Sequence, residues 1–346
     1  MAIPIQNIYY LLVYAWDKLP ESKIVNINAD ECQEYAELFA RVLINGCGLL
    51  FKRGLDRDYI GLQENYVGIK GKMLMAETIK ANTLIRSQTV CGYDDFSYDI
   101  LQNQILKFTI SRLLKVKALP RDLKKQLKSL FLRFHNVSMK DVRPQDFKRV
   151  KIHRNNAFYA FLLNVCYLIY DSLLPSEQTG EIKFKDFTRD EKKMAHLFEE
   201  FVRNFYKRKI HGFKVKRENI EWFLRPVDEK SDGLLPKMET DISLDSIDRK
   251  IIIDCKFYNE TLTEHFGKTS IRSGHLNQIY AYMSNYKINE MYDRPIEGIL
   301  LYPVTTNDFH ASFEYLGFNL KIHTINLNQP WRQIEEDLLE MITPLN

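Results

Sequence analysis

The stretch IIIDCKFY, residues 251–258, places an aspartate and a lysine directly behind three consecutive isoleucines. A run of β-branched residues predicts a buried strand. Burying a charged group is unfavourable unless the charge is paired or binds a metal. Because residues two apart on a strand share a face, Asp254 and Lys256 point one way and Cys255 points the other. The stretch therefore predicts a polar site at the end of a buried strand.

A second carboxylate is predicted to lie beside this pair. The segment KMETDISL, residues 237–244, carries Asp241 13 residues before Asp254, and the polar segment DSIDRK between the two strands has hairpin length. A hairpin brings the carboxylates together, where they repel each other unless a cation lies between them. Hard oxygen ligands of this kind favour Mg²⁺. A lysine beside the ion can position a water and stabilise charge on a phosphate.

An aspartate followed across a hairpin by D-x-K resembles the PD-(D/E)XK nuclease superfamily. The proline of that pattern is displaced here, since Pro236 precedes Asp241 by five positions. The next predicted helix carries Gln278 and Tyr282, which share a helix face and resemble the Q-x-x-x-Y pair of RecB-like members. The alternative interpretation of this pair is an ordinary side-chain hydrogen bond against the sheet.

The segment HLFEEFV, residues 196–202, offers an acidic side chain from the helix before the hairpin. Glu199 and Glu200 lie at similar angles from the apolar face of this helix, so periodicity does not choose between them. The F-E-x-F pattern of the superfamily favours Glu199 as an additional ligand. The alternative is that both are solvated helix glutamates.

Positive charge is concentrated in one part of the chain. Residues 107–154 contain 15 Lys and Arg against three Asp, whereas the net charge of the whole chain is only +4. Such a basic block can attract a phosphate backbone, and Lys124, Lys125 and Lys128 are the candidate DNA contacts. The alternative is a solvated helix face whose leucines pack inward.

Helical and strand patterns predict the organisation of the chain. The first helix is expected at 8–17, with Asn7 as its N-cap. Glycines among short apolar runs predict strands and turns near 45–95, and helices are expected at 97–135 and 155–174. A capping box, TRDE, places Thr188 at the N-cap of the next helix. The alternation of helix and strands after residue 175 predicts a mixed α/β core.

Several function classes are not supported. The five cysteines form no C-x-x-C pair, which argues against a disulfide framework and a cysteine zinc site. No stretch has the pattern of a signal peptide or a membrane span, so we expect a cytoplasmic protein without membrane contact. The segment GKTS, residues 267–270, lacks the earlier glycine of a P-loop because position 262 is leucine. We therefore expect this chain to bind no nucleotide.

Several segments together resemble the McrC family, the nuclease subunits of McrBC modification-dependent restriction systems. They occur in the same order as in that family and span nearly the whole chain. One local departure is Cys255, where alanine is usual. The segments are IPIQNIYYLLVYAW (3–16), RGLDRDY (53–59), GIKGK (68–72), LLPKMETDI (234–242), IIIDCKFY (251–258), LNQIYAYM (276–283) and GILLYPV (298–304).

This resemblance implies partners as well as an activity. Residues 1–175 would be an N-terminal α+β partner-binding region, which docks on a hexameric McrB-like AAA+ GTPase, enters its pore and stimulates GTP hydrolysis. The glycine-rich 45–95 region would be the pore-inserting element. The partner would recognise double-stranded DNA containing modified cytosine, and a second copy of this chain would bridge two rings. The candidate ring contacts are Arg53, Lys70 and Lys72.

Residues 176–346 would form the endonuclease domain, a PD-(D/E)XK core with helices flanking its sheet. Asp241, Asp254, Glu199 and the backbone carbonyl of Cys255 would bind Mg²⁺, with Mn²⁺ as the alternative ion. Lys256 would position the attacking water, and Gln278 and Tyr282 would support the site or the DNA. Two rival functions remain at this point: a non-catalytic adaptor of a AAA+ ring, and a stand-alone structure-specific nuclease.

Overall fold

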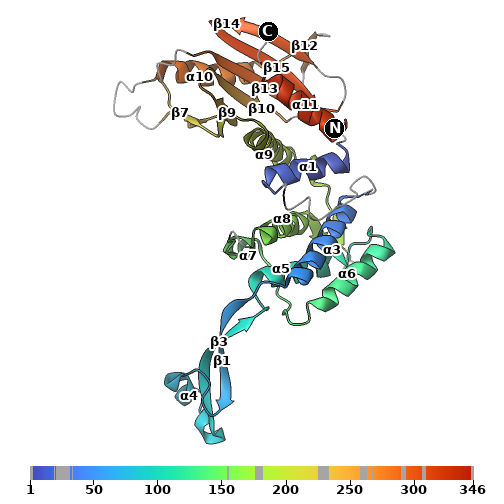
Figure 1. The fold of residues 1–346 in the computed structure, drawn as a ribbon, viewed down its shortest axis with the longest axis vertical. Helices are drawn as coiled ribbons and strands as arrows, with labels where there is room; N and C mark the ends of the chain where they lie inside the picture. The colour runs from blue at the N-terminus through green and yellow to red at the C-terminus, as the bar shows by residue number, and fades with distance from the viewer. Residues whose placement is uncertain are drawn as a thin grey trace. The chain divides into compact units, whose positions relative to one another are not determined.

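The computed structural model describes residues 3–18, 20, 32, 34–153, 156–175, 182–224, 234–257, 263–265, 268–289, 294–305 and 309–343. The chain forms two compact units (Figure 1). The first, here called the sheet unit, comprises residues 1–22 and 186–346, and the second, the arm unit, lies within residues 32–185. The sequence-based boundary after residue 175 thus falls ten residues before the observed one. The first helix, predicted to lie in the N-terminal domain, belongs to the C-terminal unit.

A six-stranded mixed sheet forms the centre of the sheet unit, in the order β14-β15-β13-β10-β9-β6. β10, β13 and β15 are parallel to one another, whereas β14, β9 and β6 each pair antiparallel with a neighbour. The predicted mixed α/β class and the predicted hairpin are confirmed, the hairpin by the pairing of β9 with β10. The strands of this unit are β6 (Lys214–Lys216), β7 (Asn219–Ile220), β8 (Met238–Glu239), β9 (Ile242–Asp245), β10 (Lys250–Cys255), β11 (Thr263–His265), β12 (Lys268–Ser270), β13 (Ile296–Val304), β14 (His310–Tyr315) and β15 (Phe318–Asn326).

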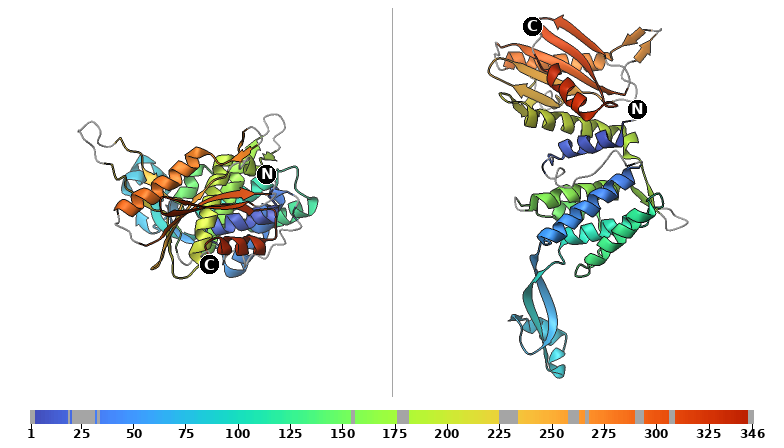
Figure 2. Two further views of the ribbon diagram at one scale, coloured as in Figure 1. Left: turned by 90° about the horizontal axis from the view of Figure 1, so that it is seen from above. Right: turned by 45° about the vertical axis from the view of Figure 1, so that its right-hand side comes forward.

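Helices cover both faces of this sheet (Figure 2). α10 connects the parallel strands β10 and β13 and packs on both, burying Ile279 and Met283 against Ile252. α9 contacts β6, β9 and β10 on the other face, α11 contacts β15, and α1 packs on α9. The helices are α1 (Ile5–Ala15), η4 (Phe187–Arg189), α9 (Glu191–Lys209), α10 (Ser273–Asn289) and α11 (Trp331–Met341).

Side-chain contacts over a long sequence separation hold α1 in the sheet unit. The buried Asn7 amide donates to the carbonyl oxygens of Leu327 at 2.8 Å and Gln329 at 2.9 Å. The Tyr14 hydroxyl donates to Glu335 of α11 at 2.6 Å. The prediction of Asn7 as an N-cap is therefore wrong, because the helix begins at Ile5. The Asn7 amide instead donates to backbone carbonyl groups in the segment between β15 and α11, which thereby gain hydrogen-bond partners.

The start of α9 also differs from the prediction. The N-cap is Asp190, whose carboxylate accepts a hydrogen bond from the Lys193 N–H at 3.2 Å. Thr188 instead lies in the short 3₁₀ helix η4, where its N–H and hydroxyl both donate to Asp186. Two aspartates that cap two successive turns thus replace the single predicted capping box.

The arm unit combines a helical bundle with a long hairpin. β1 and β3 pair antiparallel over ten residues and project from the helices (Figures 1 and 2). α4 lies at the far end of this hairpin, and η2 follows it in the chain. We call residues 58–97, which comprise the hairpin with β2, α4 and η2, the arm. The elements are α3 (Tyr35–Arg53), β1 (Asp58–Val67), β2 (Lys72–Met73), α4 (Met75–Lys80), η2 (Thr83–Arg86), β3 (Gln88–Ser97), α5 (Leu101–Leu113), α6 (Arg121–Arg133), α7 (Pro144–Arg149), α8 (Ala157–Ser172), β4 (Leu173–Pro175) and β5 (Ile182–Phe184).

Two predicted boundaries in this unit are wrong. Strands and turns were expected from residue 45, but α3 continues to Arg53. Gly46 serves close helix packing instead of a turn, since a Cβ there would overlap the Leu162 side chain of α8. The single helical region expected at 97–135 consists of α5 and α6, separated by a segment that ends at Pro120.

Among the described helices, none combines the length and the apolar composition that spanning a bilayer requires.

Candidate active site

The β9–β10 hairpin brings Asp241 and Asp254 together. Ile242 pairs with Ile253 in the antiparallel register, so Asp241 follows at the end of the ladder opposite Asp254. One Asp241 carboxylate oxygen accepts a hydrogen bond from the Cys255 N–H at 2.8 Å. The Cys255 side chain is buried on the other face of β10, near Tyr206 of α9. The alternation predicted from the sequence thus directs the Asp254 and Cys255 side chains to opposite faces.

Asp254 is completely buried, and its two carboxylate oxygens are not equally satisfied. Oδ2 forms an ion pair with the Lys256 Nζ at 2.7 Å, although not with the geometry of a regular hydrogen bond, whereas Oδ1 has neither an ion-pair nor a hydrogen-bond partner among the described residues. Burial raises the pKa of Asp254, and the negative charge of Asp241 adds to this effect, against the opposing charge of Lys256. An unpaired carboxylate oxygen in the interior is costly, so this position suits a cation that the protein alone does not supply.

A chain of hydrogen bonds fixes Lys256 between the hairpin and α10. Its Nζ donates to the Gln278 Oε1 at 2.9 Å, and the Gln278 amide donates to the Tyr282 hydroxyl at 2.6 Å. That hydroxyl donates in turn to the backbone carbonyl of Glu239 at 2.9 Å. Gln278 and Tyr282 therefore orient the lysine and tie α10 to β8. The sequence placed them on one helix face, and the structure directs that face to Lys256.

The structure distinguishes Glu199 from Glu200. Glu199 pairs with Arg217 at 3.1 Å, and burial raises its pKa to about 7, with Asp241 as the second cause and a smaller contribution from Asp254. Glu200 pairs with Arg203 on its own helix. The charge of Glu199 is therefore coupled to both hairpin carboxylates.

Three further residues lie at the site without having been predicted. Burial raises the pKa of Asp241, and the positive charges of Arg217 and Arg203 oppose this rise. His275, one turn before Gln278, lies with its Nδ1 2.9 Å from the Tyr302 hydroxyl, and burial followed by the charge of Lys256 lowers its pKa to about 4. The spacing of His275 from Gln278 was a usable helical signal, whereas nothing in the sequence marks Arg217.

The donor set fits a hard divalent cation. Among the described residues, no three His, Cys, Asp or Glu side chains already lie in metal-binding geometry. Mg²⁺ does not need such a cage, because it usually keeps several waters and binds one or two carboxylates. Asp241 and Asp254 supply those carboxylates, and the Oδ1 of Asp254 is an acceptor that no described residue occupies. Besides burial, the charges of both carboxylates raise the pKa of Glu199, so its carboxylate lies near them. A bound ion would polarise a phosphodiester and lower the pKa of a water.

The carboxylates should make the stability of the metal-free protein depend on pH. Folding raises the pKa of Glu199 from 4.5 to about 7, so the folded state holds the extra proton between these values. The free energy of unfolding should therefore fall as pH rises from 4.5 to above 7. Urea unfolding of the full chain in chelator at pH 5, 6, 7 and 8 measures this slope. Glu199→Gln should flatten it, and an unchanged slope would contradict the coupling. Glu200→Gln is the matched control on the same helix.

The candidate ring contacts lie in different parts of the arm unit. Lys70 and Lys72 belong to the arm, and the Lys70 ammonium lies 3.7 Å from the centre of the Tyr93 ring. A hydrogen bond with Tyr93 raises the pKa of Lys70, and the smaller effect of desolvation opposes it. Arg53 is the last residue of α3 and packs over Phe158. The structure thus places two of the three on the arm and one on the helical bundle.

The candidate DNA contacts Lys124, Lys125 and Lys128 lie on α6, whose Leu123, Leu127 and Leu130 are buried. Lys125 and Lys128 are exposed, and Lys124 is half-buried. The lysine face is therefore solvated and apolar packing holds the helix, while DNA contact through these lysines stays a prediction.

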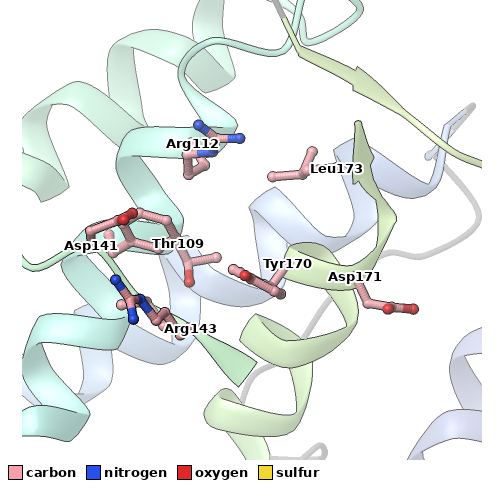
Figure 3. A pocket seen from close by; sticks show the side chains of 9 residues that line it. Thr109, Arg112, Asp141, Arg143, Tyr170, Asp171 and Leu173 are labelled. Atoms are coloured by element: carbon pink, nitrogen blue, oxygen red, sulfur yellow. The ribbon is translucent and has the colours of Figure 1, made fainter. Parts of the chain in front are cut away.

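A cavity of about 400 Å³ lies in the same basic block, between α5 and α8 (Figure 3). Arg112 and Arg143 lie on opposite sides of it, and Asp141 and Asp171 also line it. These formal charges cancel, so the cavity shows no preference for an anion.

Comparison with known proteins identifies the family. A family model described as McrBC 5-methylcytosine restriction system component matches residues 8–303. The chain is 32% identical over 339 residues to the type IV methyl-directed restriction enzyme EcoKMcrBC of Escherichia coli strain K12, covering 98% of this chain and 97% of the relative. The fold resembles, with a TM-score of 0.59 and 15% identity, a chain in a half-complex from a tetradecameric assembly of Thermococcus gammatolerans McrB AAA+ hexamers with bound McrC, over 98% of this chain and 76% of that one. The chain therefore belongs to the family of McrBC 5-methylcytosine restriction system components, as a McrC-type subunit.

Proposed function

We propose that this chain is the Mg²⁺-dependent DNA endonuclease subunit of a GTP-dependent restriction complex directed at modified cytosine. The observation that carries the proposal is the completely buried Asp254, paired with Lys256 and adjacent to Asp241, with one carboxylate oxygen that no described residue contacts by an ion pair or hydrogen bond. A structural carboxylate at this depth would have its hydrogen bonds filled by the protein.

The chain's own residues have distinct roles in this proposal. Asp241 and Asp254 would hold the ion, and Glu199 would join them once it loses its proton. Lys256, oriented by Gln278, would position the attacking water and stabilise the charge that develops on the phosphate. The side chains thus provide orientation and fixed charge at the reacting phosphodiester.

The same observations argue against the two rivals. A non-catalytic adaptor would gain nothing from keeping a buried carboxylate with an oxygen that the described residues leave without a partner, since an apolar residue would be more stable there. A stand-alone nuclease would not need the arm unit, which contributes none of the site residues. The name of the E. coli relative describes a methyl-directed restriction enzyme, which supports a restriction role for this chain as well.

The arm supports the proposal of a AAA+ partner. Its strands and tip expose large apolar side chains that would be unfavourable in water, among them Ile69, 65% exposed, and Ile85, 77% exposed. Exposed apolar surface on a projecting element marks a protein interface. We propose that the arm enters the pore of a hexameric McrB-like GTPase and stimulates its turnover, and that a second copy of this chain bridges two rings. Solved structures of this fold include one with McrB hexamers and McrC.

Metal removal tests the nuclease activity. The purified complex with its AAA+ GTPase should cut plasmid containing 5-methylcytosine when GTP and Mg²⁺ are present, and chelation by EDTA should abolish cutting. Adding Mg²⁺ in excess over EDTA should restore the wild-type rate, because the carboxylates remain in place. Cleavage that continues in EDTA, or that is equal on unmodified plasmid, would contradict the proposal.

Substitutions on the arm test the partner interaction separately. Replacing the exposed Ile69 and Ile85 with serine should reduce stimulation of the GTPase at least about tenfold, since buried apolar anchors dominate interface energies. The fold should not change, because neither side chain is buried in this protein. Leu132→Ser is the matched control, as Leu132 is equally exposed at 65% but lies on α6. Equal stimulation by the arm variant and the control would rule out the arm as the contact.

A further inference from the structure

Asp241 lies in a gap between two strands. β8 ends at Glu239 and pairs with β7, whereas β9 begins at Ile242 and pairs with β10 and β6. Thr240 and Asp241 belong to neither strand. The regular ladder that holds Asp254 in place therefore does not extend to Asp241. The Cys255 N–H holds the Asp241 carboxylate, but the backbone at this residue must be fixed by another feature.

Glu218 makes hydrogen bonds on both sides of this gap. Its backbone carbonyl accepts from the Thr240 N–H at 2.9 Å, and its N–H donates to the Thr240 hydroxyl at 3.2 Å. Its carboxylate accepts from the Ser243 hydroxyl at 2.8 Å. Thr240 and Ser243 are both completely buried, and they flank Asp241 in the chain. One residue thus holds the backbone before Asp241 and the side chain just after it.

The carboxylate of Glu218 is itself held by a buried lysine. Lys250, at the start of β10, is completely buried, and its Nζ lies 2.6 Å from the Glu218 Oε2. The same ammonium group lies 3.6 Å from the centre of the Tyr286 ring on α10. Lys216 pairs with the other carboxylate oxygen. The residues around the Glu218 carboxylate therefore connect β6, β9, β10 and α10. Asp241 directly precedes β9, Asp254 lies on β10, and Gln278 lies on α10.

A buried ion pair of this kind is a weak source of stability, because desolvation offsets most of the Coulomb attraction and apolar residues of similar volume do as well. Its effect is to fix geometry, since the donors and acceptors are satisfied in only one arrangement. Burial opposes ionisation of Glu218, but the hydrogen bonds from Lys216, Lys250 and Ser243 outweigh it and lower its pKa. The acceptor is therefore ionised at neutral pH, where the active site would work.

We propose that Glu218 is the positioning residue for Asp241: through Thr240, Ser243 and Lys250 it sets the carboxylate at the place where it shares a divalent cation with Asp254. This inference rests on the proposed function. It assigns to the Glu218–Lys250 pair an effect on metal affinity, acting through Asp241 and without contact to the ion.

The test replaces the pair without leaving a buried charge. Glu218→Gln with Lys250→Met keeps the shapes of both side chains, so the full chain should fold. Its affinity for Mg²⁺, measured by calorimetry without DNA, should fall about 10–100-fold, as is usual when the support of a metal ligand is lost. Amide hydrogen exchange of the metal-free chain should become faster at residues 240–243. Ser243→Ala, which keeps the ion pair, should show the same two changes to a smaller extent.

The chain offers a matched control. Lys321 and Glu297 form a second buried pair in the same sheet, 3.0 Å apart, between β15 and β13. Glu297→Gln with Lys321→Met makes the same chemical change away from β9, and it should leave Mg²⁺ affinity and exchange at 240–243 unchanged.

The outcomes separate the two proposals. If the wild-type chain binds Mg²⁺ and the Glu218 double variant and Ser243→Ala bind it equally well, the positioning role is wrong and the nuclease proposal stands. An equal loss in the control pair would show a general effect of sheet stability and would also overturn the positioning role. If the wild-type chain binds no divalent cation, the proposed function fails, and the positioning role fails with it. A double variant that does not fold leaves Ser243→Ala to decide, by the same two measurements.

Discussion

Asp254→Asn is expected to abolish DNA cleavage by the complex while leaving the chain folded. Asparagine has nearly the shape of aspartate but cannot supply the charged oxygens that hold a hard cation. The fold should tolerate the change, because burial raises the pKa of Asp254 and thus makes its ionised form costly in the folded state. The measurements are the cleavage rate on plasmid containing 5-methylcytosine and the midpoint of thermal unfolding, which should not fall. Stimulation of the partner GTPase should also persist, since the arm is unaltered.

Asp245→Asn provides the control for this substitution. Asp245 lies at the opposite end of the same hairpin and pairs with Arg294 at 3.6 Å. Its replacement should leave the cleavage rate within about twofold of wild type, because this partly exposed pair lies away from Asp241 and Asp254 and does not contact them. Cleavage by Asp254→Asn at the wild-type rate would remove this residue from the mechanism.

Lys256→Met is expected to lower the cleavage rate by about 10²–10³, the usual loss when a preorganised charge at the reacting group is removed. Methionine preserves much of the apolar stem, so packing against α10 should change little. Mg²⁺ binding should be retained, since Asp241 and Asp254 are unaltered. Rate and affinity therefore need separate measurement, by single-turnover cleavage and by calorimetry.

The control for the lysine is Lys237→Met, an exposed lysine before β8 whose partner is Glu239. It should cut at the wild-type rate. If Lys256→Met loses both metal affinity and activity, Lys256 supports the structure of the site and does not act on the water. If it keeps both, the lysine has no part in catalysis.

The core of the site could be predicted from local patterns. A period of two along IIIDCK determines which side chains share a face, and the short polar turn determines that Asp241 returns to Asp254. Both rules depend on a few neighbouring residues, so contacts with distant parts of the chain did not change their outcome. The i, i+4 spacing of Gln278 and Tyr282 is equally local. Periodicity did not separate Glu199 from Glu200, because both have the same relation to the apolar face of α9, and only the superfamily pattern favoured Glu199. The structure adds that burial and the charge of Asp241 raise the pKa of Glu199.

The errors occurred where distant segments meet. Asn7 has the residue type of an N-cap, but its amide bonds to carbonyl groups more than 300 residues away, around Leu327. The region near 45–95 was expected to hold strands and turns, but its first residues belong to α3, where Gly46 permits the close approach of α8 at Leu162. The strand β14 was not predicted, since its pairing with β15 and not its own sequence pattern holds it. In each case the local structure depends on a segment that is distant in the sequence, and a pattern read from neighbouring residues does not contain it.

The arm unit is an insertion within the sheet unit, because α1 lies before it in the chain and the remaining elements lie after it. During synthesis, residues 32–185 can therefore fold as soon as they leave the ribosome. The apolar helix α1 emerges earlier but must wait for α9 and for Glu335 of α11 before its contacts exist. Contacts this distant in sequence make folding slow and leave apolar surface uncovered meanwhile. We therefore expect nascent chains stalled before α11 to bind chaperones through α1, whereas the arm unit is already protected from proteases.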